Sequence, residues 1–479
     1  MGIDRIRRFL TDLPAAVFVL VCAAAGCSST QPSYPSEAYR PAGSWISASE
    51  YAGRRERLME RIQGGVAIIP GATAPVDSGQ FRQNNDFFYL TGVEIPGAFL
   101  VVDSVAKAST LFFTLTEHEA RAEGIPLELV HDPVAATGIE RVRPVEELAP
   151  QLAEFHARTP IFYTPHFPQE LPRVSSLEGF AAWNHTIAEN PWDGRPTRQH
   201  RFIARLRETL PGVEVRDCSP LIWQLRKFKS EAEIALIRRA ARIAVDGHRA
   251  LIRSTEPGIS EQDLAALFGF ICRKEGAQDL AYPTILMAGP HHPFGHYHRY
   301  DRVLQDGDFV ILDAGPDYAY YDADVSSSFP VSGAFTPHQR NLYELAEAIH
   351  QVCLAGYRPG RTFREVGRDV AAYLTESGLD PQESRFRGVT TWGGYNHPIG
   401  MATHDVMKSM SGPDEVLEPG FVFACDINMP QDEEFGIRIE DTVVITADGC
   451  EVLSAGLPRA VAEIESLMKE QGLLQRMER

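Results

Sequence analysis

Basic residues are scarce in this chain of 479 residues, which carries 46 lysines and arginines against 64 aspartates and glutamates. The net charge of −18 argues against a nucleic-acid ligand, because phosphate recognition requires clustered lysine and arginine. Long apolar runs are also missing, and none reaches the roughly 18–20 residues that a membrane-spanning helix needs. Apolar residues nevertheless make up 44% of the chain, which is typical of globular rather than disordered or fibrous proteins. The length suggests two or three domains.

Cysteine is sparse as well, with seven residues in the chain. The five that follow the first 27 residues are Cys218, Cys272, Cys353, Cys425 and Cys450. Their number is odd and their spacing matches no metal cluster. An exported protein could form disulfides, but isolated buried thiols fit this pattern better.

The first 27 residues have the pattern of an export signal. Three arginines at positions 5–8 precede an apolar stretch at 13–25, which is too short to span a bilayer but suits a secretory signal. The stretch ends in small residues followed by Cys27, and it resembles a bacterial lipoprotein signal peptide with its lipobox. We therefore expect export and a lipid anchor on Cys27 in a bacterial membrane, with the outer membrane facing the periplasm favoured; a plain signal peptide is the alternative. Residues 28–45, rich in Ser, Pro and Tyr, are predicted to be a flexible tether.

The rest of the chain divides into two regions. Residues 46–215 alternate short β-rich runs with helical stretches, which indicates a mixed α/β domain, and the polar, proline-containing segment 183–200 is predicted to be a long loop. In residues 220–479, Ser230 and Glu233 form a capping box that predicts a helix start. Helices are expected within 225–252, after residue 260 and at 337–357, and apolar strands at 309–312, 325–331, 421–427 and 437–445.

The strongest chemical signal is a pair of aspartates around a predicted hairpin. The apolar strand 309–312 leads directly into Asp313, and a second strand begins at Asp324. If the strands pair around residues 318–319, the two aspartates lie opposite each other with Cβ atoms about 4.5–5.5 Å apart. Two carboxylates this close repel each other, so either one is protonated or a cation lies between them.

A second predicted hairpin repeats this pattern. Asp426 ends an apolar run, Glu440 lies inside a strand, and a turn centred near Glu433 would place the two acids across from each other. Four carboxylates with a nearby imidazole would form an oxygen-rich pocket suited to two divalent ions. The candidate imidazoles are His397 and His404 in one segment and His291, His292, His296 and His298 in another.

Together these motifs resemble the pita-bread metallopeptidases, and within them the Xaa-Pro aminopeptidase and prolidase (aminopeptidase P) branch. The matching pieces are Asp313-x10-Asp324, His397-x2-Gly400-x3-His404-Asp405, Leu417-Glu-Pro-Gly420 and Gly436-Ile-Arg-Ile-Glu440-Asp441. The run Phe81–Gly92 resembles part of the branch's non-catalytic domain. The resemblance implies an α+β fold, with a pita-bread (creatinase/aminopeptidase-like) catalytic domain at 220–479 preceded by a smaller α/β creatinase-like domain at 46–215.

The resemblance also implies a metallo-aminopeptidase that hydrolyses the N-terminal Xaa-Pro bond of peptides through a hydroxide bridging two metal ions. The implied metal ligands are Asp313, Asp324, His397, Asp426 and Glu440, and Asp324 and Glu440 would bridge the ions. His296 and His404 would hydrogen-bond the scissile carbonyl and the developing oxyanion, and Arg438 would orient a carboxylate or the substrate. One imidazole among four carboxylates favours Mn²⁺, with Co²⁺ or Zn²⁺ as alternatives. Dimers are frequent in the family, so a homodimer is favoured.

Three positions depart from the family's pattern. Asp426 stands where the family has glutamate, Gly393 stands where the proline-specific enzymes usually have a histidine, and Ser327 replaces an arginine. The alternatives are therefore a dipeptidase (prolidase) or another hydrolase on the same fold, including a metal-free amidinohydrolase resembling creatinase, and a catalytically impaired peptide-binding protein. All five implied ligand positions keep side chains that can bind a metal, which favours the metal-dependent aminopeptidase.

Overall fold

The computed structural model describes residues 45–74, 81–167, 176–406, 412–430 and 435–477. The predicted leader, nearly all of the predicted tether and the loop 431–434 lie outside these residues. Among the helices of the described segments, none combines the length and the apolar character needed to cross a membrane.

A six-stranded mixed sheet forms the centre of the N-terminal part. Its strands are β1 (Val66–Pro70), β2 (Phe99–Asp103), β3 (Ala108–Phe112), β4 (Arg141–Arg143), β5 (Ile161–Thr164) and β6 (Glu214–Asp217). Their order is β4-β3-β2-β1-β5-β6. Successive residues of β1 point to opposite faces: Val66 and Ile68 pack in one apolar cluster, and Ala67 and Ile69 pack in the other.

Helices cover both faces of this sheet. The helices of this part are α1 (Ala48–Arg61), α2 (Asn85–Thr91), α3 (Glu117–Glu123), α4 (Glu128–His131), α5 (Pro133–Thr137), α6 (Leu148–Arg158), α7 (Leu177–Glu189) and α8 (Arg198–Thr209). Helices α1 and α2 pack in one of the two apolar clusters, and α6 and α8 pack in the other. The predicted loop at 183–200 is wrong, because α7 and α8 occupy all of it except residues 190–197. The hydroxyls of Ser176 and Thr197 cap these two helices, and capping stabilises a helix start even in a polar segment.

The C-terminal part is built on a seven-stranded sheet. Its strands are β8 (Ile285–Ala288), β9 (Phe309–Asp313), β12 (Ser326–Pro330), β13 (His397–Pro398), β14 (Val422–Pro430), β15 (Gly436–Ile445) and β16 (Cys450–Val452). The order is β13-β14-β15-β12-β9-β8, with β16 paired to β15. A small second sheet consists of β7 (Asp279–Leu280), β10 (Pro316–Tyr318) and β11 (Tyr321–Asp322).

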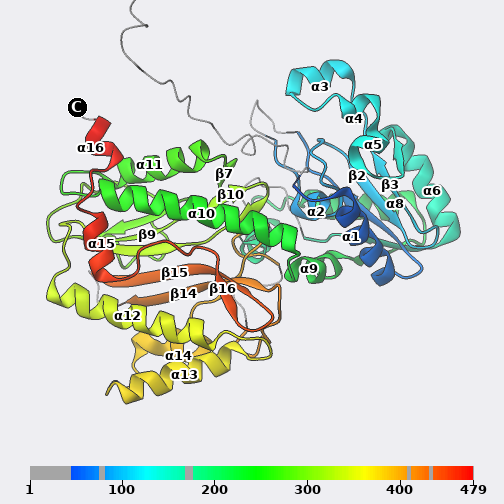
Figure 1. The fold of residues 1–479 in the computed structure, drawn as a ribbon. Helices are drawn as coiled ribbons and strands as arrows, with labels where there is room; N and C mark the ends of the chain where they lie inside the picture. Colours follow the sequence, from blue (N-terminus) through cyan, green and yellow to red (C-terminus); the bar gives the residue numbers. More distant parts are fainter. Residues whose placement is uncertain (1–44, 75–80, 168–175, 407–411, 431–434, 478–479) are drawn as a thin grey trace, which may run out of the picture. The chain divides into compact units, whose positions relative to one another are not determined.

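Helices lie on both sides of the C-terminal sheet (Figure 1). The helices of this part are α9 (Ser219–Lys227), which packs against α1 and α2, and α10 (Glu231–Ser254), α11 (Glu261–Lys274), α12 (Pro337–Gly356), α13 (Phe363–Glu376), α14 (Arg387–Trp392), α15 (Val461–Leu467) and α16 (Leu473–Met477). In Figure 1, α10 and α11 cover one face, and α12 to α14 lie beyond the other. The capping box of Ser230 and Glu233 opens α10 as predicted. The arrangement confirms the predicted α+β fold class.

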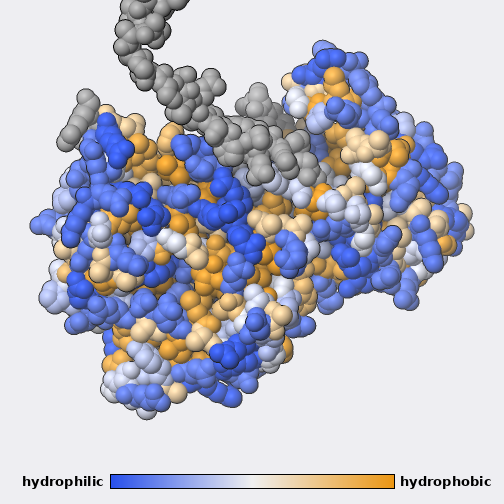
Figure 2. All heavy atoms as spheres, in the orientation of Figure 1, coloured by the Kyte–Doolittle hydropathy of each residue, from blue (hydrophilic) through white to orange (hydrophobic). Residues whose placement is uncertain are grey.

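Burial follows from this layering. All ten residues of β15 are buried, including its charged ones, so the charges inside the sheet need partners or a ligand. Hydrophilic residues cover most of the face drawn in Figure 2. The five cysteines of the described residues are free, and all but the partly exposed Cys450 are buried, which agrees with the expectation of thiols rather than disulfides.

Candidate metal centre

The first predicted hairpin exists, but its register differs from the expectation. Tyr318 pairs with Tyr321, and Ala319 and Tyr320 form the turn with φ angles of 52° and 74°. Two positive φ angles are the signature of a tight type I′ turn, which lies one residue later than predicted. The partner of Asp313 is therefore Ser326, and the prediction that Asp324 lies directly opposite Asp313 is wrong.

Asp313 and Asp324 nevertheless face the same point. The Tyr282 hydroxyl lies 2.6 Å from Asp313 Oδ1 and 2.5 Å from Asp324 Oδ1. Both carboxylates are buried, and burial together with the charge of Asp324 raises the pKa of Asp313 well above its usual range. Tyr282 has no signal in the sequence, because it lies between two strands, β7 and β8, and belongs to no spaced motif.

The second hairpin has the predicted register. Asp426 of β14 pairs with Glu440 of β15. The Ser326 hydroxyl donates a hydrogen bond of 2.6 Å to Glu440 Oε2, whereas Asp426 Oδ1 is buried and has no hydrogen-bond partner among the described residues. Burial and the charge of Glu440 raise the pKa of Asp426. A buried carboxylate oxygen without a partner is expected where a cation is to be bound.

His397 connects the two hairpins. Its Nδ1 lies 3.0 Å from the Thr403 carbonyl, and a proton donated there leaves Nε2 as the metal-binding nitrogen. Nε2 lies 3.4 Å from Asp324 Oδ2 and 3.6 Å from Glu440 Oε1. Ligand atoms of these three residues lie within 4.8 Å of one another. Without an ion, burial would lower the pKa of His397, but the bonds and charges of Asp324 and Glu440 outweigh it and raise the pKa to about 10.

The three other predicted site residues lie around this cluster. Arg438 Nη1 donates a hydrogen bond of 2.5 Å to Asp313 Oδ2, and its Nη2 donates one of 3.4 Å to the carbonyl of Gly295, the neighbour of His296. The imidazole of His404 stacks on that of His397, with ring centroids 3.9 Å apart. Burial and the charge of Arg438 lower the pKa of His296, which favours the neutral imidazole.

Comparisons with known proteins agree with this geometry. Residues 235–447 match the family described as metallopeptidase family M24, and residues 51–162 match the aminopeptidase P N-terminal domain. The chain is 30% identical over 459 residues to the Xaa-Pro aminopeptidase of Escherichia coli K12, covering 88% of this chain and 98% of the relative. The chain belongs to metallopeptidase family M24. It is also 26% identical over 464 residues to human Xaa-Pro aminopeptidase 3, covering 89% and 87% of the two chains.

Solved structures of aminopeptidases P share the fold. Zinc-substituted E. coli aminopeptidase P in complex with product has a TM-score of 0.69 at 28% identity. Pseudomonas aeruginosa aminopeptidase PepP has a TM-score of 0.69 at 27% identity. Each comparison covers 88% of this chain and 98% of the other. These likenesses confirm the predicted family, fold and metallopeptidase class.

The N-terminal domain supports the M24 site through the run Phe81–Gly92. The Arg226 guanidinium is 1% exposed and forms ion pairs with Asp86 of that run and with Asp405, the neighbour of His404. Asn85 Nδ2 donates a hydrogen bond of 2.7 Å to the Met401 carbonyl. The role of Arg226 has no signal in the sequence, because a lone arginine in a helix resembles any surface arginine.

The structure shows the surroundings of Gly393 and Ser327, two of the three positions that depart from the family's pattern. Gly393 has a φ of 63° at the end of α14, and a Cβ there would lie 2.9 Å from Val366 Cγ1, so a histidine does not fit this backbone. The Ser327 hydroxyl lies 2.7 Å from His248 Nδ1, and His248 Nε2 lies 3.1 Å from the Ala314 carbonyl. Burial lowers the pKa of His248 to about 4. A neutral His248–Ser327 pair therefore joins α10 to β12.

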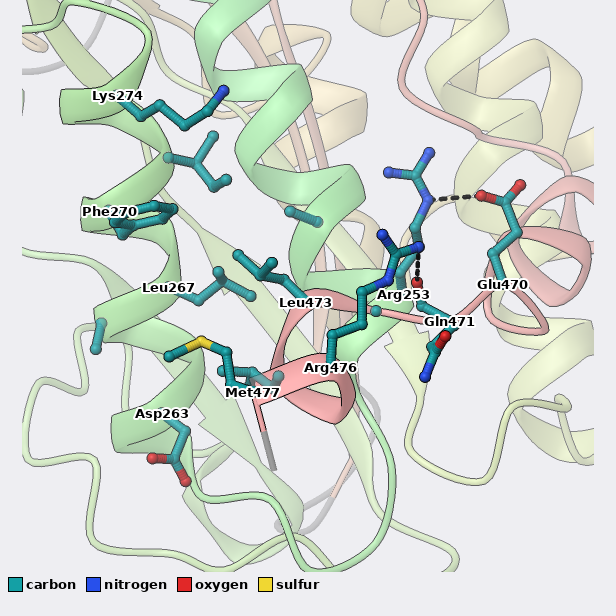
Figure 3. A pocket seen from close by; sticks show the side chains of 15 residues that line it. Arg253, Asp263, Leu267, Phe270, Lys274, Glu470, Gln471, Leu473, Arg476 and Met477 are labelled. Atoms are coloured by element: carbon teal, nitrogen blue, oxygen red, sulfur yellow. Dashed lines mark hydrogen bonds and ion pairs between the residues drawn. The ribbon is translucent and has the colours of Figure 1, made fainter. Parts of the chain in front are cut away.

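A pocket of about 790 Å³ lies elsewhere, between α10, α11 and the C-terminal segment (Figure 3). Its walls are mainly apolar, with Leu267, Phe270, Leu473 and Met477 labelled in Figure 3. It contains none of the predicted site residues.

Proposed function

We propose that this chain is a metal-dependent aminopeptidase that releases the N-terminal residue preceding proline from peptides. The observation that carries this proposal is the cluster of four carboxylates and one imidazole, which is buried except for the partly exposed Asp426. The cluster is held in a chain that matches nearly the whole of an Xaa-Pro aminopeptidase. Without bound cations some of these carboxylates would have to be protonated, because burial and mutual repulsion raise the pKa values of Asp313 and Asp426.

We assign the metal ligands to Asp313, Asp324, His397, Asp426 and Glu440. The donor set fits two divalent ions: Asp426 Oδ1 lacks a partner among the described residues, and His397 Nε2 faces two carboxylates. One nitrogen among many oxygens favours Mn²⁺ over softer ions, with Co²⁺ and Zn²⁺ as alternatives. Bound divalent ions would supply a nucleophilic water by lowering its pKa towards neutrality.

The chain's own residues would position the substrate and move its protons. Two histidines are placed to donate hydrogen bonds to the scissile carbonyl and its developing charge. One is His404, which stacks on His397; the other is His296, whose neighbour Gly295 accepts a hydrogen bond from Arg438. Arg438 holds Asp313 in position. Asp426, whose buried Oδ1 has no hydrogen-bond partner among the described residues, would also take up a proton from the attacking water.

The test is turnover of matched Xaa-Pro and Xaa-Ala peptides by residues 28–479 with added Mn²⁺. Release of the first residue from the Xaa-Pro peptides is expected, with loss of turnover and of bound metal in Asp313→Asn and in Glu440→Gln. Asp448→Asn is the matched control, because Asp448 is an exposed carboxylate in a turn. If the metal-loaded protein binds these peptides without cleaving them, the peptide-binding alternative replaces the proposal. If the protein cleaves them without metal, the metal-free, amidinohydrolase-like alternative replaces it.

We further propose that the protein is exported and anchored through a lipid on Cys27 in a bacterial membrane, with the outer membrane facing the periplasm favoured, and that it forms a homodimer. The leader pattern and its lipobox-like end support the anchor, and the family resemblance supports the dimer. Incorporation of labelled fatty acid should be lost in Cys27→Ala. Light scattering of residues 28–479 should give twice the mass of one chain; a monomer would reject the dimer but leave the catalytic proposal untouched.

A further inference from the structure

A second group of metal-binding side chains lies outside the carboxylate cluster. It consists of Glu261, His291 and Asp301, each of which offers a ligand atom within 4.8 Å of the others. Glu261 begins α11 and is fully buried, whereas the side chains of His291 and Asp301 are 16% and 49% exposed. A cation can therefore reach this group from solvent.

Glu261 anchors both ends of the segment that carries the other two residues. Its Oε1 accepts a hydrogen bond of 3.1 Å from the Ala288 amide, and its Oε2 accepts one of 3.1 Å from the Arg302 amide. His291 Nδ1 lies 2.9 Å from the same Oε1. Glu261 thereby fixes the position and the orientation of the His291 ring.

This anchoring decides which nitrogen of His291 faces outwards. A carboxylate accepts hydrogen bonds, so Nδ1 carries the proton that is donated to Glu261. In the neutral ring Nε2 is then left with its lone pair, and it lies 3.6 Å from Asp301 Oδ1. Two unprotonated acceptors do not attract each other, so a proton or a cation belongs between them.

The separation favours the cation. A distance of 3.6 Å is too long for a good hydrogen bond. Two ligands bound to one ion at roughly 2.1 Å with a tetrahedral angle lie about 3.4 Å apart. Asp301 is held as well: the Tyr297 hydroxyl donates to its Oδ1, and the Tyr297 ring stacks on His291 with centroids 4.0 Å apart. Arg299 Nε approaches the other oxygen, Oδ2, at 3.4 Å.

We propose that His291 Nε2 and Asp301 Oδ1 bind a divalent transition-metal ion of the Zn²⁺ class, with water completing its shell. Glu261 is the buried carboxylate that orients the ligating imidazole, and Tyr297 orients the ligating carboxylate; supporting groups of this kind typically accompany histidine ligands. The ion would join two residues that stand ten positions apart in the chain and would close the segment between them into a ring.

The ring would contain His296 and Gly295, the residue whose carbonyl accepts from Arg438. An ion at this site would restrict the segment that positions His296. This consequence for catalysis rests on the proposed function, whereas the existence of the site does not. Binding must therefore be measured with the carboxylate cluster disabled.

The experiment uses the Asp313→Asn/Glu440→Gln double variant of residues 28–479. Zn²⁺ is titrated into this variant and its binding is measured by calorimetry; Co²⁺ is titrated separately and its binding is followed by its visible absorption spectrum. One ion per chain is expected, and the further change His291→Gln should abolish its binding. Tyr297→Phe should weaken binding by roughly 10–100-fold, the effect typical of removing a supporting group. His298→Gln is the control, because His298 is an exposed imidazole of the same segment.

Several outcomes would overturn the proposal. The site is excluded if the double variant binds no ion. It is also excluded if the double variant binds an ion equally well after the further change His291→Gln. A high pKa for His291 in nuclear magnetic resonance titrations of the metal-free and metal-treated protein alike would show that a proton, not an ion, joins His291 to Asp301. Circular dichroism melting of each variant establishes that a lost ion does not reflect a lost fold. Because the carboxylate cluster is disabled throughout, none of these results depends on the peptidase activity.

Discussion

Replacing Arg226 with methionine should destabilise the protein and slow its reaction together. Arg226 is 1% exposed, and Asp86 and Asp405 are 2% and 1% exposed. Its Nη1 donates a hydrogen bond of 2.6 Å to Asp86 Oδ1, and its Nη2 donates to Asp405 Oδ1. Methionine fills much of the arginine's volume but leaves two buried carboxylates without their shared cation. Removing one partner of a buried ion pair typically costs about 3–5 kcal/mol.

That cost can be converted into a melting temperature. The entropy of unfolding is about 2.1 cal/mol/K per residue, or roughly 0.8 kcal/mol/K for about 400 ordered residues that unfold together. A loss of 3–5 kcal/mol then lowers the melting temperature by about 4–6 °C. Scanning calorimetry of residues 28–479 at one fixed scan rate measures this shift.

Arg226→Lys is the matched control, because it keeps the charge but not the fork that reaches both carboxylates. It should lie between the wild type and Arg226→Met. Turnover should fall in the methionine variant as well, since Asp405 adjoins His404. A methionine variant that melts within 1 °C of the wild type and keeps full activity would refute the reasoning, because Asp86 and Asp405 would then be stable without the guanidinium, with only Lys229 Nζ 3.8 Å from Asp405 Oδ2.

Three further changes test individual residues. Asp426→Glu should keep or raise turnover of an Xaa-Pro peptide, and loss of bound metal in this variant would show that β14 is adapted to the shorter side chain. His404→Ala should lower turnover by roughly 10²–10³ without changing the metal content, so an unaltered rate excludes its role. The pKa of His248 is about 4 in the folded protein and about 6.5 in the unfolded chain, so protonation favours the unfolded chain. The free energy of unfolding should therefore fall by up to about 3 kcal/mol as the pH drops from 6.5 to 4. Urea unfolding across this range should show a smaller loss for His248→Gln, and equal slopes would contradict the assignment.

The two hairpins show what the sequence can predict about the site. The register of Asp426 and Glu440 followed from two apolar runs of similar length placed symmetrically about one loop. The same argument failed for Asp313 and Asp324, because the turn is formed by Ala319 and Tyr320 with positive φ angles. Glycine or asparagine usually marks such turns, so the sequence carried no signal for this position.

Residues that act through distant contacts could not be found from spacing. Tyr282 joins Asp313 and Asp324, and Arg226 joins residues that stand 140 and 179 positions away. Their partners become neighbours only when two domains and several strands have packed. A cluster of buried carboxylates is easier to predict, because carboxylates at the ends of apolar strands conflict with their surroundings and the conflict is visible in the sequence.

The departures from the family's pattern at positions 393 and 426 have different physical causes, and the structure shows both. At position 393 the limit is the backbone: a φ of 63° and the nearby Val366 side chain exclude a large residue unless α13 and α14 move apart. At position 426 the backbone keeps its register with Glu440, and only the reach of the carboxylate changes. A glycine at position 393, with side chains able to bind metal kept at all five proposed ligand positions, should alter first how the site holds a peptide. Selection among peptides is therefore the property in which this chain should differ most from its relatives.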